Sequence, residues 1–301
     1  MPLLREEAAK LSNNQLVSGV VEEIIDKDEM FAFLPFVGVK GKAYVYNREK
    51  TLADADFLDP NEEIKESAST FEEVTAKLRI LAGDVDIDKF LDSTMDDTNN
   101  QMAIQVTQKA KGVGRKFHKT LATGDASVNP KEFDGIAKLV TEEQTISAGP
   151  DGGGITLALL DELLDKVPHG ADCLVMRRGT IRAYRNLLRV TSGTDAVMQM
   201  VENFGRPMLT HNGVPIVMNE FLPADEVMGT NTKTCSIYAI RANEVDGLHG
   251  IYGGGPAGIV VENIGTVQNK DATRIRLKWY VGLVLKSTKS LARLKGVTNI
   301  Q

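Results

Sequence analysis

The chain has 301 residues, of which 42% are hydrophobic and 25% charged, so it is long enough to bury one large core or two smaller ones. Its net charge of −6 at pH 7 argues against a sequence-specific nucleic-acid-binding protein, because such proteins normally carry an excess of Lys and Arg that neutralises phosphates. No apolar run approaches the roughly 20 residues of a membrane-spanning helix, and the N-terminus lacks a signal-peptide pattern, so we expect a soluble protein that stays in a cytoplasm.

The first 82 residues are predicted to form an arm and a hairpin. Apolar residues between Leu4 and Asp26 roughly keep helical spacing with polar interruptions, which indicates a broken helix or an arm. Strand-like stretches at 37–46 and 69–81 flank Arg48–Ser67, where seven acidic and three basic residues give a charge of −4. An isolated two-stranded hairpin is marginal in water, so we expect this one to need a partner surface on another subunit. The candidate contact residues at its tip are Asp54, Asp56, Asp59, Glu62, Glu63 and Glu66.

Residues 86–121 are predicted to form one long helix, since the segment contains regularly spaced apolar residues and no proline. Such a helix would span about 50 Å at 1.5 Å per residue, which is typical of a structural spine. Its later half is basic and contains no acid between Lys109 and Lys119. The basic residues form either a solvated face or a docking surface for an acidic partner. These residues are Lys109, Lys111, Arg115, Lys116 and Lys119.

From Phe133 onwards the pattern changes to short strands and modest helices, which predicts a compact α/β domain. We expect helices at 156–167 and 180–189, and strands at 173–176, 213–218 and 235–240. Charged and apolar residues then alternate from Thr273 to Thr288, which predicts a strand of about 50 Å. Strands in globular proteins usually have 3 to 10 residues. The chain is therefore predicted to leave an elongated part, build a compact one and return.

No motif for catalysis or cofactor binding is found. The glycine run Gly152–Gly154 resembles a phosphate-binding loop but lacks the Gly-Lys-Ser/Thr ending, and the glycines of 250–258 favour a turn between strands. Cys173 and Cys235 have no partner at metal-ligand spacing, and the four histidines are scattered without a nucleophile context. We expect no catalytic residue, no cofactor and no metal. The histidines are His118, His169, His211 and His249.

The order of these elements, together with local signatures, resembles the major capsid proteins of tailed bacteriophages. Leu34–Phe36 followed by Gly41–Glu49 looks like the family's entry into its extended loop, and Gly124–Ile136 is similar to the segment that closes the spine helix and opens the axial domain. The resemblance extends over nearly the whole chain. Further matches are Asn212–Val217, Val245–Gly250 and Trp279–Leu283.

This resemblance implies an α+β fold of the Hong Kong 97 type. Such a fold has an N-terminal arm, an extended hairpin loop, a peripheral domain with a long spine helix and long β-strands, and an axial α/β domain. The implied division is an N-terminal arm at 1–37, the extended loop hairpin at 38–82, the peripheral domain with its spine helix at 83–132, the axial domain at 133–257, and the return to the peripheral domain at 258–301.

The implied function is assembly rather than catalysis. Copies of the chain are expected to form hexamers and pentamers that close an icosahedral phage head around double-stranded DNA, without sequence specificity, through repeated heterologous interfaces. The shell would be assembled in the host cytoplasm and become the virion capsid. Expected partners besides the chain itself are a portal and separate scaffolding or decoration proteins. Two alternatives stay open. The chain could instead form an encapsulin-like nanocompartment shell that encloses cargo protein, or it could be a small-molecule enzyme that uses the glycine-rich loops.

Three expectations concern the assembled shell. We expect the acidic hairpin tip to lie over the basic spine face of a neighbouring copy. Because the arm follows Met1 almost at once, we expect no removal of a large N-terminal domain. Some relatives join a loop lysine to a neighbour's asparagine with help from a buried glutamate, but here we expect noncovalent contacts alone. The residues that such cross-linking would use are Lys42, Lys50, Lys65, Asn263, Asn269, Asn299 and Glu262.

Overall fold

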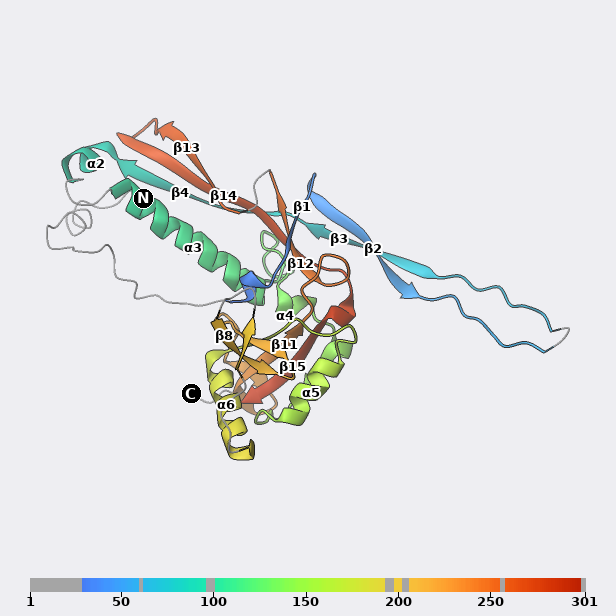
Figure 1. Cartoon of the computed structure of the whole chain (residues 1–301). Helices are drawn as coiled ribbons and strands as arrows, with labels where there is room; N and C mark the ends of the chain where they lie inside the picture. Colours follow the sequence, from blue (N-terminus) through green and yellow to red (C-terminus); the bar gives the residue numbers. More distant parts are fainter. Residues whose placement is uncertain are drawn as a thin grey trace.

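A computed structural model describes residues 29–59, 62–95, 101–192, 198–201, 206–254 and 258–298. The described chain has three parts (Figure 1). A long sheet with one long helix beneath it forms an elongated upper layer, a compact α/β unit lies below, and a two-stranded hairpin projects far to one side. The expected N-terminal helix or arm at 4–26 lies outside the described residues.

The elongated layer is built around β14, the 14-residue strand Ala272–Leu285. The predicted long strand at 273–288 is therefore confirmed, with slightly different ends. On one side β14 pairs antiparallel with β4 over ten consecutive residue pairs, from Ala272 opposite Asp88 to Val281 opposite Arg79. On the other side it pairs with β13 and then β12, and β12 also pairs with β1. These strands are β1 (Phe36–Gly38), β4 (Arg79–Asp88), β12 (Leu248–Gly253) and β13 (Val260–Thr266).

Helix α3 (Gln101–Thr123) packs against one face of this sheet. Successive side chains of a strand point to opposite faces, so Ile275 and Leu277 of β14 lie on the α3 side and pack with Val113. Further along, the rings of Phe117 and Trp279 have centroids 4.5 Å apart. Burial of these apolar side chains fixes the helix beneath the sheet.

The prediction of a single helix over 86–121 is wrong at its beginning. Strand β4 continues to Asp88, a separate helix α2 covers Lys89–Met95, and α3 has 23 residues, or about 34 Å. The physical reason lies in the alternation from Val85 to Asp88, which places apolar side chains on the α3 side and aspartates on the other. The strand-like stretch predicted at 69–81 is likewise two strands, which Leu78 separates.

The hairpin consists of β2 (Ala43–Thr51) and β3 (Thr70–Lys77), which pair antiparallel from Ala43 opposite Lys77 to Thr51 opposite Thr70. Between these strands the described residues of the tip have no helix or strand. The hairpin predicted around the acidic segment is therefore confirmed, and it extends away from the rest of the chain (Figure 1).

The compact unit contains a second sheet with the strand order β5-β15-β11-β6-β9-β8-β7, and β10 pairs with β11. Helices α5 (Leu157–Asp165) and α6 (Arg178–Ser192) cover the same face of this sheet, because both contribute buried side chains to one apolar cluster. The predicted helices and strands of this unit are confirmed with small shifts of their ends. The strands are β5 (Thr145–Ser147), β6 (Cys173–Met176), β7 (Met198–Val201), β8 (Arg206–His211), β9 (Val214–Met218), β10 (Glu226–Met228), β11 (Asn231–Ile240) and β15 (Leu291–Thr298).

Short helical turns complete the described chain. Helix α4 (Ile136–Leu139) lies where α3 leads into the compact unit, and its Ile136 is fully buried. The 3-10 turns are Met30–Ala32, Glu142–Gln144 and Thr288–Ser290. Among the helices that the structure describes, none is both long and apolar enough to cross a membrane.

Candidate assembly interface

The base of the hairpin is fastened to the end of β14 by three side chains of β2. Residues 44, 46 and 48 share one face of the strand, since side chains alternate. The Tyr46 hydroxyl donates to the carbonyl oxygen of Leu285 at 2.7 Å, and the Arg48 guanidinium donates to the carbonyl oxygens of Lys286 and Leu285, both at 2.8 Å. Burial raises the pKa of Tyr46, although Arg48 opposes the shift. The hairpin therefore leaves the body in a defined direction.

Tyr44 completes this anchor. Its ring meets the buried His249 edge to face at a centroid distance of 6.0 Å, and the Lys286 ammonium lies 5.7 Å from its centre. Pattern reasoning identified the strand but not the anchor, because the acceptors are backbone carbonyls of residues more than 230 positions away. The alternation of Tyr44, Tyr46 and Arg48 along the strand was the sequence feature that could have indicated this anchor.

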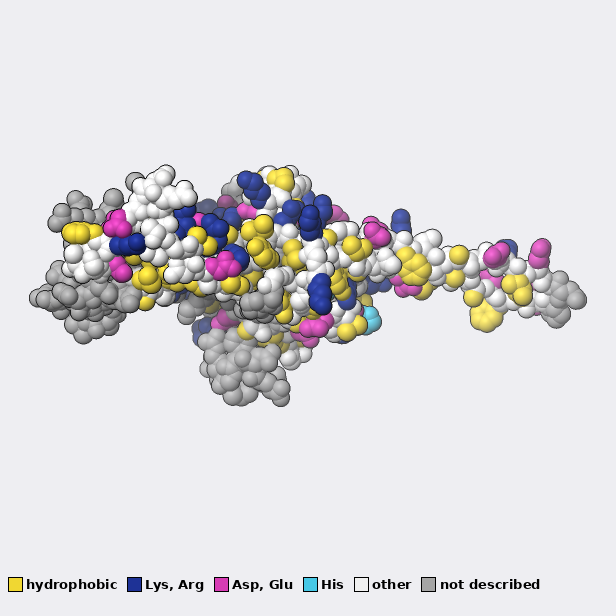
Figure 2. Space-filling view, turned by 90° about the horizontal axis from the view of Figure 1, so that it is seen from above, with side chains coloured by type: hydrophobic (Ala, Val, Ile, Leu, Met, Phe, Trp, Pro, Cys, Tyr) yellow, Lys and Arg dark blue, Asp and Glu magenta, His cyan; other side chains and the backbone are white. Residues whose placement is uncertain are grey.

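The hairpin tip exposes both apolar and acidic side chains. Phe57 is 107% exposed, Ile64 is 80% exposed and Leu52 is 72% exposed. Figure 2 shows yellow and magenta side chains alternating along the projecting hairpin. Apolar groups gathered on an otherwise charged projection mark an interaction site. All six acidic candidates are exposed, and these are Asp54, Asp56, Asp59, Glu62, Glu63 and Glu66.

The five basic residues of α3 do not lie on a single face. Lys111, Arg115 and Lys119 are exposed and, at spacings of four, form one row along the helix. Lys109 lies on another side, where its side chain covers Gly83 of β4. Lys116 pairs with Glu132 at 2.6 Å. Figure 1 shows the hairpin pointing away from α3 of its own chain.

The sheet face opposite α3 carries paired charges. Arg274 makes a bidentate pair with Asp86 at 2.6 and 2.8 Å, and Arg276 makes one with Asp84 at 2.8 and 2.9 Å. The hydrogen bonds from these arginines lower the pKa of both aspartates. Each charge is matched within the chain, so this face has little attraction for a charged ligand.

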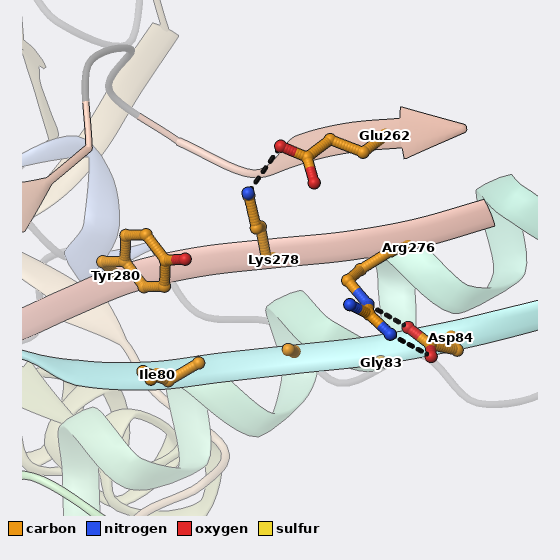
Figure 3. A pocket seen from close by; sticks show the side chains of 8 residues that line it. Ile80, Gly83, Asp84, Glu262, Arg276, Lys278 and Tyr280 are labelled. Carbon is orange, nitrogen blue, oxygen red and sulfur yellow. Dashed lines mark hydrogen bonds and ion pairs between the residues drawn. The ribbon is translucent and has the colours of Figure 1, made fainter. Parts of the chain in front are cut away.

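A shallow groove of about 500 Å³ lies on the same face. Figure 3 shows the Lys278 ammonium reaching Glu262 across it, with Tyr280 and Ile80 at one end. Ile80 is 73% exposed. The groove combines neutralised charges with apolar side chains, as protein contact surfaces do.

The described residues contain no group of three His, Cys, Asp or Glu side chains that could hold a metal ion. The arrangement most similar to a catalytic one joins His211 to Asp161 at 2.9 Å and to the Tyr184 hydroxyl at 3.0 Å. Tyr184 is only 2% exposed and burial raises its pKa, so it offers neither access nor a reactive oxygen. These contacts tie α5, α6 and β8 together.

The first glycine-rich segment is a packed turn rather than an open loop. Gly152 has φ +78° and lies against the backbone of Gly296, so a side chain there would collide with the carbonyl oxygen. The adjacent Asp151 carboxylate accepts hydrogen bonds from the Thr230 amide at 2.9 Å and hydroxyl at 3.1 Å, which lower its pKa. Cys173 and Cys235 are buried and form no disulfide bond. Gly152 and the two cysteines are thus packed within the compact unit.

Comparison with known proteins identifies a family and several similar structures. The model of the SU10 major capsid protein family matches residues 48–298. Among curated proteins, no sequence matches the chain. Among solved structures, the holo-SrpI encapsulin complex from Synechococcus elongatus PCC 7942 is similar with a TM-score of 0.76 and 19% identity over 99% of this chain and 98% of that one.

Two viral structures are similar to a comparable extent. The capsid of cyanophage A-1(L) has a TM-score of 0.66 and 13% identity, with 96% of this chain and 99% of that chain covered. A structure from Mycobacterium phage Adephagia has a TM-score of 0.63 and 15% identity, with 100% and 99% covered. At such identities the likeness establishes the fold, which confirms the expected Hong Kong 97-like architecture.

Proposed function

The chain belongs to the SU10 major capsid protein family and is therefore a subunit of a phage head shell, and on that premise we propose how its surfaces build the shell. Copies form hexamers and pentamers that close an icosahedral particle around double-stranded DNA. The work is done by heterologous contacts repeated around symmetry axes, and no reaction is catalysed.

One observation carries this proposal. The hairpin is anchored at its base by Tyr46 and Arg48, while Phe57 and Ile64 at its tip have no cover from the described part of the chain. An isolated hairpin with exposed apolar side chains is unfavourable in water, and burial against another copy removes that cost. The shape therefore suits a subunit that is completed by its neighbours.

We further propose that the acidic tip lies over the row of Lys111, Arg115 and Lys119 on a neighbouring copy's α3. Opposite charges on two separated surfaces of one chain support this contact, and its strength should fall with salt. Reversing the charges of Asp56 and Glu63 to lysine should impair assembly and leave the subunit folded. Reversing Lys111 and Arg115 to glutamate in the same chain should restore assembly, and normal shells from the tip variant alone would refute the contact.

Electron microscopy of the expressed full-length chain tests the proposed function. Shells, tubes or ring-shaped capsomers are the expected result, and a homogeneous monomer at high protein concentration would contradict it. An encapsulin-like shell remains the second candidate because of the likeness to the encapsulin structure. Virions that contain nuclease-protected DNA and a portal would favour the phage head, whereas a protein cargo without DNA would favour the nanocompartment.

Partners other than the chain itself are also proposals. We expect a portal and separate scaffolding or decoration proteins, and contact with packaged DNA that does not depend on base sequence. The division at residues 37, 82, 132 and 257 stays a prediction. A stoichiometric nucleotide or metal in the purified protein would instead favour the enzyme alternative.

A further inference from the structure

Helix α6 carries four arginines on one side and no acidic residue. Their spacings of 4, 3 and 4 residues place them within about 60° around the helix axis, at 100° per residue. Ala183 and Tyr184 are buried on the opposite side. All four arginines are exposed, and Arg178 pairs with Glu220 at 2.9 Å while keeping 65% of its side chain exposed. We call Arg178, Arg182, Arg185 and Arg189 the arginine row.

Helix α5 carries the opposite charge. Asp161, Glu162 and Asp165 are exposed, and Leu157–Asp165 contains no basic residue. Leu160 and Leu163 are fully buried beneath them. Asp161 already accepts hydrogen bonds from His211 and Asn212, so Glu162 and Asp165 are the carboxylates that keep their capacity for another partner.

The two helices lie at different places along one layer. Helix α5 packs against β15 and β11, whereas α6 packs against β9, which lies further along the same sheet. One helix of the layer is therefore basic and the other acidic. Nucleic acid is a poor partner for such a layer, since the α5 carboxylates would repel the phosphates that the arginine row attracts. A second copy of the chain offers an acidic α5 to the arginine row and an arginine row to the acidic α5.

We propose that the arginine row of one copy docks on Glu162 and Asp165 of the next copy, head to tail around a capsomer ring. This inference rests on the proposed function. The row extends over about 16 Å, and Glu162 and Asp165 lie about 5 Å apart along α5, so the two carboxylates meet one part of the row. Guanidinium and carboxylate groups form short bidentate pairs, which add direction to the contact. A ring requires two different complementary surfaces on each copy, and this layer provides them.

Two variants with reversed charges, tested separately and then mixed, test the proposal. The first variant carries Arg182→Glu, Arg185→Glu and Arg189→Glu, so that both helices are acidic, and the second carries Glu162→Arg and Asp165→Arg, so that both are basic. Each full-length variant alone should lose about tenfold or more of the material that sediments as shells or capsomers at low salt. Mixing the two should recover most of it, because each acidic helix then meets a basic one on another copy. Recovery in the mixture distinguishes contact between copies from a contact within one chain.

Several outcomes would overturn the proposal. Wild-type assembly by either variant alone, or no recovery in the mixture while both variants show wild-type thermal unfolding, would exclude the contact. Loss of duplex DNA retention with unchanged assembly would assign the arginine row to DNA. If a reversal prevents folding, Arg185→Gln and Glu162→Gln replace it, and each should shift half-maximal assembly to lower salt. Failure of the wild-type chain to assemble at all would refute the proposed function instead.

Discussion

The Tyr46 hydroxyl donates a hydrogen bond of 2.7 Å to the backbone carbonyl of Leu285, a residue 239 positions later in the sequence. Leu285 is the last residue of β14, the strand on which the whole elongated layer is built. The same carbonyl accepts from Arg48 at 2.8 Å. The direction of the hairpin is thus set by the end of the longest strand.

Loss of this anchor should loosen the hairpin in proportion to the bonds removed. Tyr46→Phe removes the hydrogen bond to Leu285 and a weak one of 3.4 Å from Arg48, and should lower the free energy of unfolding by about 0.5–1.5 kcal/mol. Arg48→Met removes all three hydrogen bonds of the guanidinium and should cost about 2 kcal/mol. Urea unfolding measures both. Asn47→Ala, which changes the exposed residue between them, is the matched control and should have little effect. Equal stability of all three variants would show that the anchor contributes nothing.

The middle of α3 contains two glycines that no neighbour requires. A Cβ at Gly112 or Gly114 would meet no atom of the described residues within 4 Å. Because glycine loses more backbone entropy than alanine in a helix, Gly112→Ala and Gly114→Ala should each raise the free energy of unfolding by about 0.5–1 kcal/mol. Gly124 serves as the contrast, since its Cβ would collide with the carbonyl oxygens of Thr120 and Phe133. Gly124→Ala should destabilise the fold by about 1–3 kcal/mol.

His249 makes stability depend on pH. Its side chain is fully buried, and burial lowers its pKa from 6.5 more than the backbone of Gly247 and Asn243 raises it. The unfolded chain therefore binds a proton at a higher pH than the folded chain does. The contribution of His249 to stability is fully present above about pH 6.5 and is lost as the pH falls below that value.

Urea unfolding at pH 7.5 and 5.5 checks this expectation. The wild-type protein should be less stable at pH 5.5, and His249→Phe should reduce the difference because it removes the titrating group. His169→Phe changes an exposed histidine and should keep the wild-type difference. An unchanged difference in His249→Phe would mean that another group carries the pH dependence.

The sequence pattern predicted the elements whose alternation or periodicity is local. Strand β14 was found because Ile275, Leu277 and Trp279 alternate with charged residues, and β6 was found because all four of its residues are apolar. The beginning of the spine was missed because Asp86 and Asp88 are compatible with a helix until β14 is known to pair beside them. Long-range pairing overrides local preference there.

The candidate surfaces were predicted in part. The acidic tip and the row of Lys111, Arg115 and Lys119 are exposed, but a charge count could not separate this row from Lys109 and Lys116. Those two side chains contact Gly83 and Glu132 of the same chain. The anchor at Tyr46 depends on backbone carbonyls that sequence patterns do not locate. Whether the proposed contacts form between copies stays a prediction, since it depends on surfaces of two molecules at once.

The candidates for covalent cross-linking lie in surroundings that do not suit the reaction. An isopeptide bond needs a deprotonated lysine amine, an oriented asparagine amide and a proton acceptor shielded from water. The Glu262 carboxylate pairs with the Lys278 ammonium at 2.5 Å, and its side chain is 40% exposed. The Asn263 side-chain oxygen accepts from the Gly265 amide at 2.9 Å within an exposed bulge of β13. Neither group is placed to activate an amine.

The remaining candidates are exposed as well, except Asn299, which lies outside the described residues. These are Lys42, Lys50, Lys65 and Asn269. The described residues therefore give these lysines no site shielded from water, which the reaction requires. We therefore predict that mature particles are held together by noncovalent contacts alone. Boiling them in detergent and running a denaturing gel should give one band near 32.8 kDa, because nothing would then join the subunits. A ladder of bands, or protein retained in the well, would show that neighbouring copies supply the shielding that the single chain lacks.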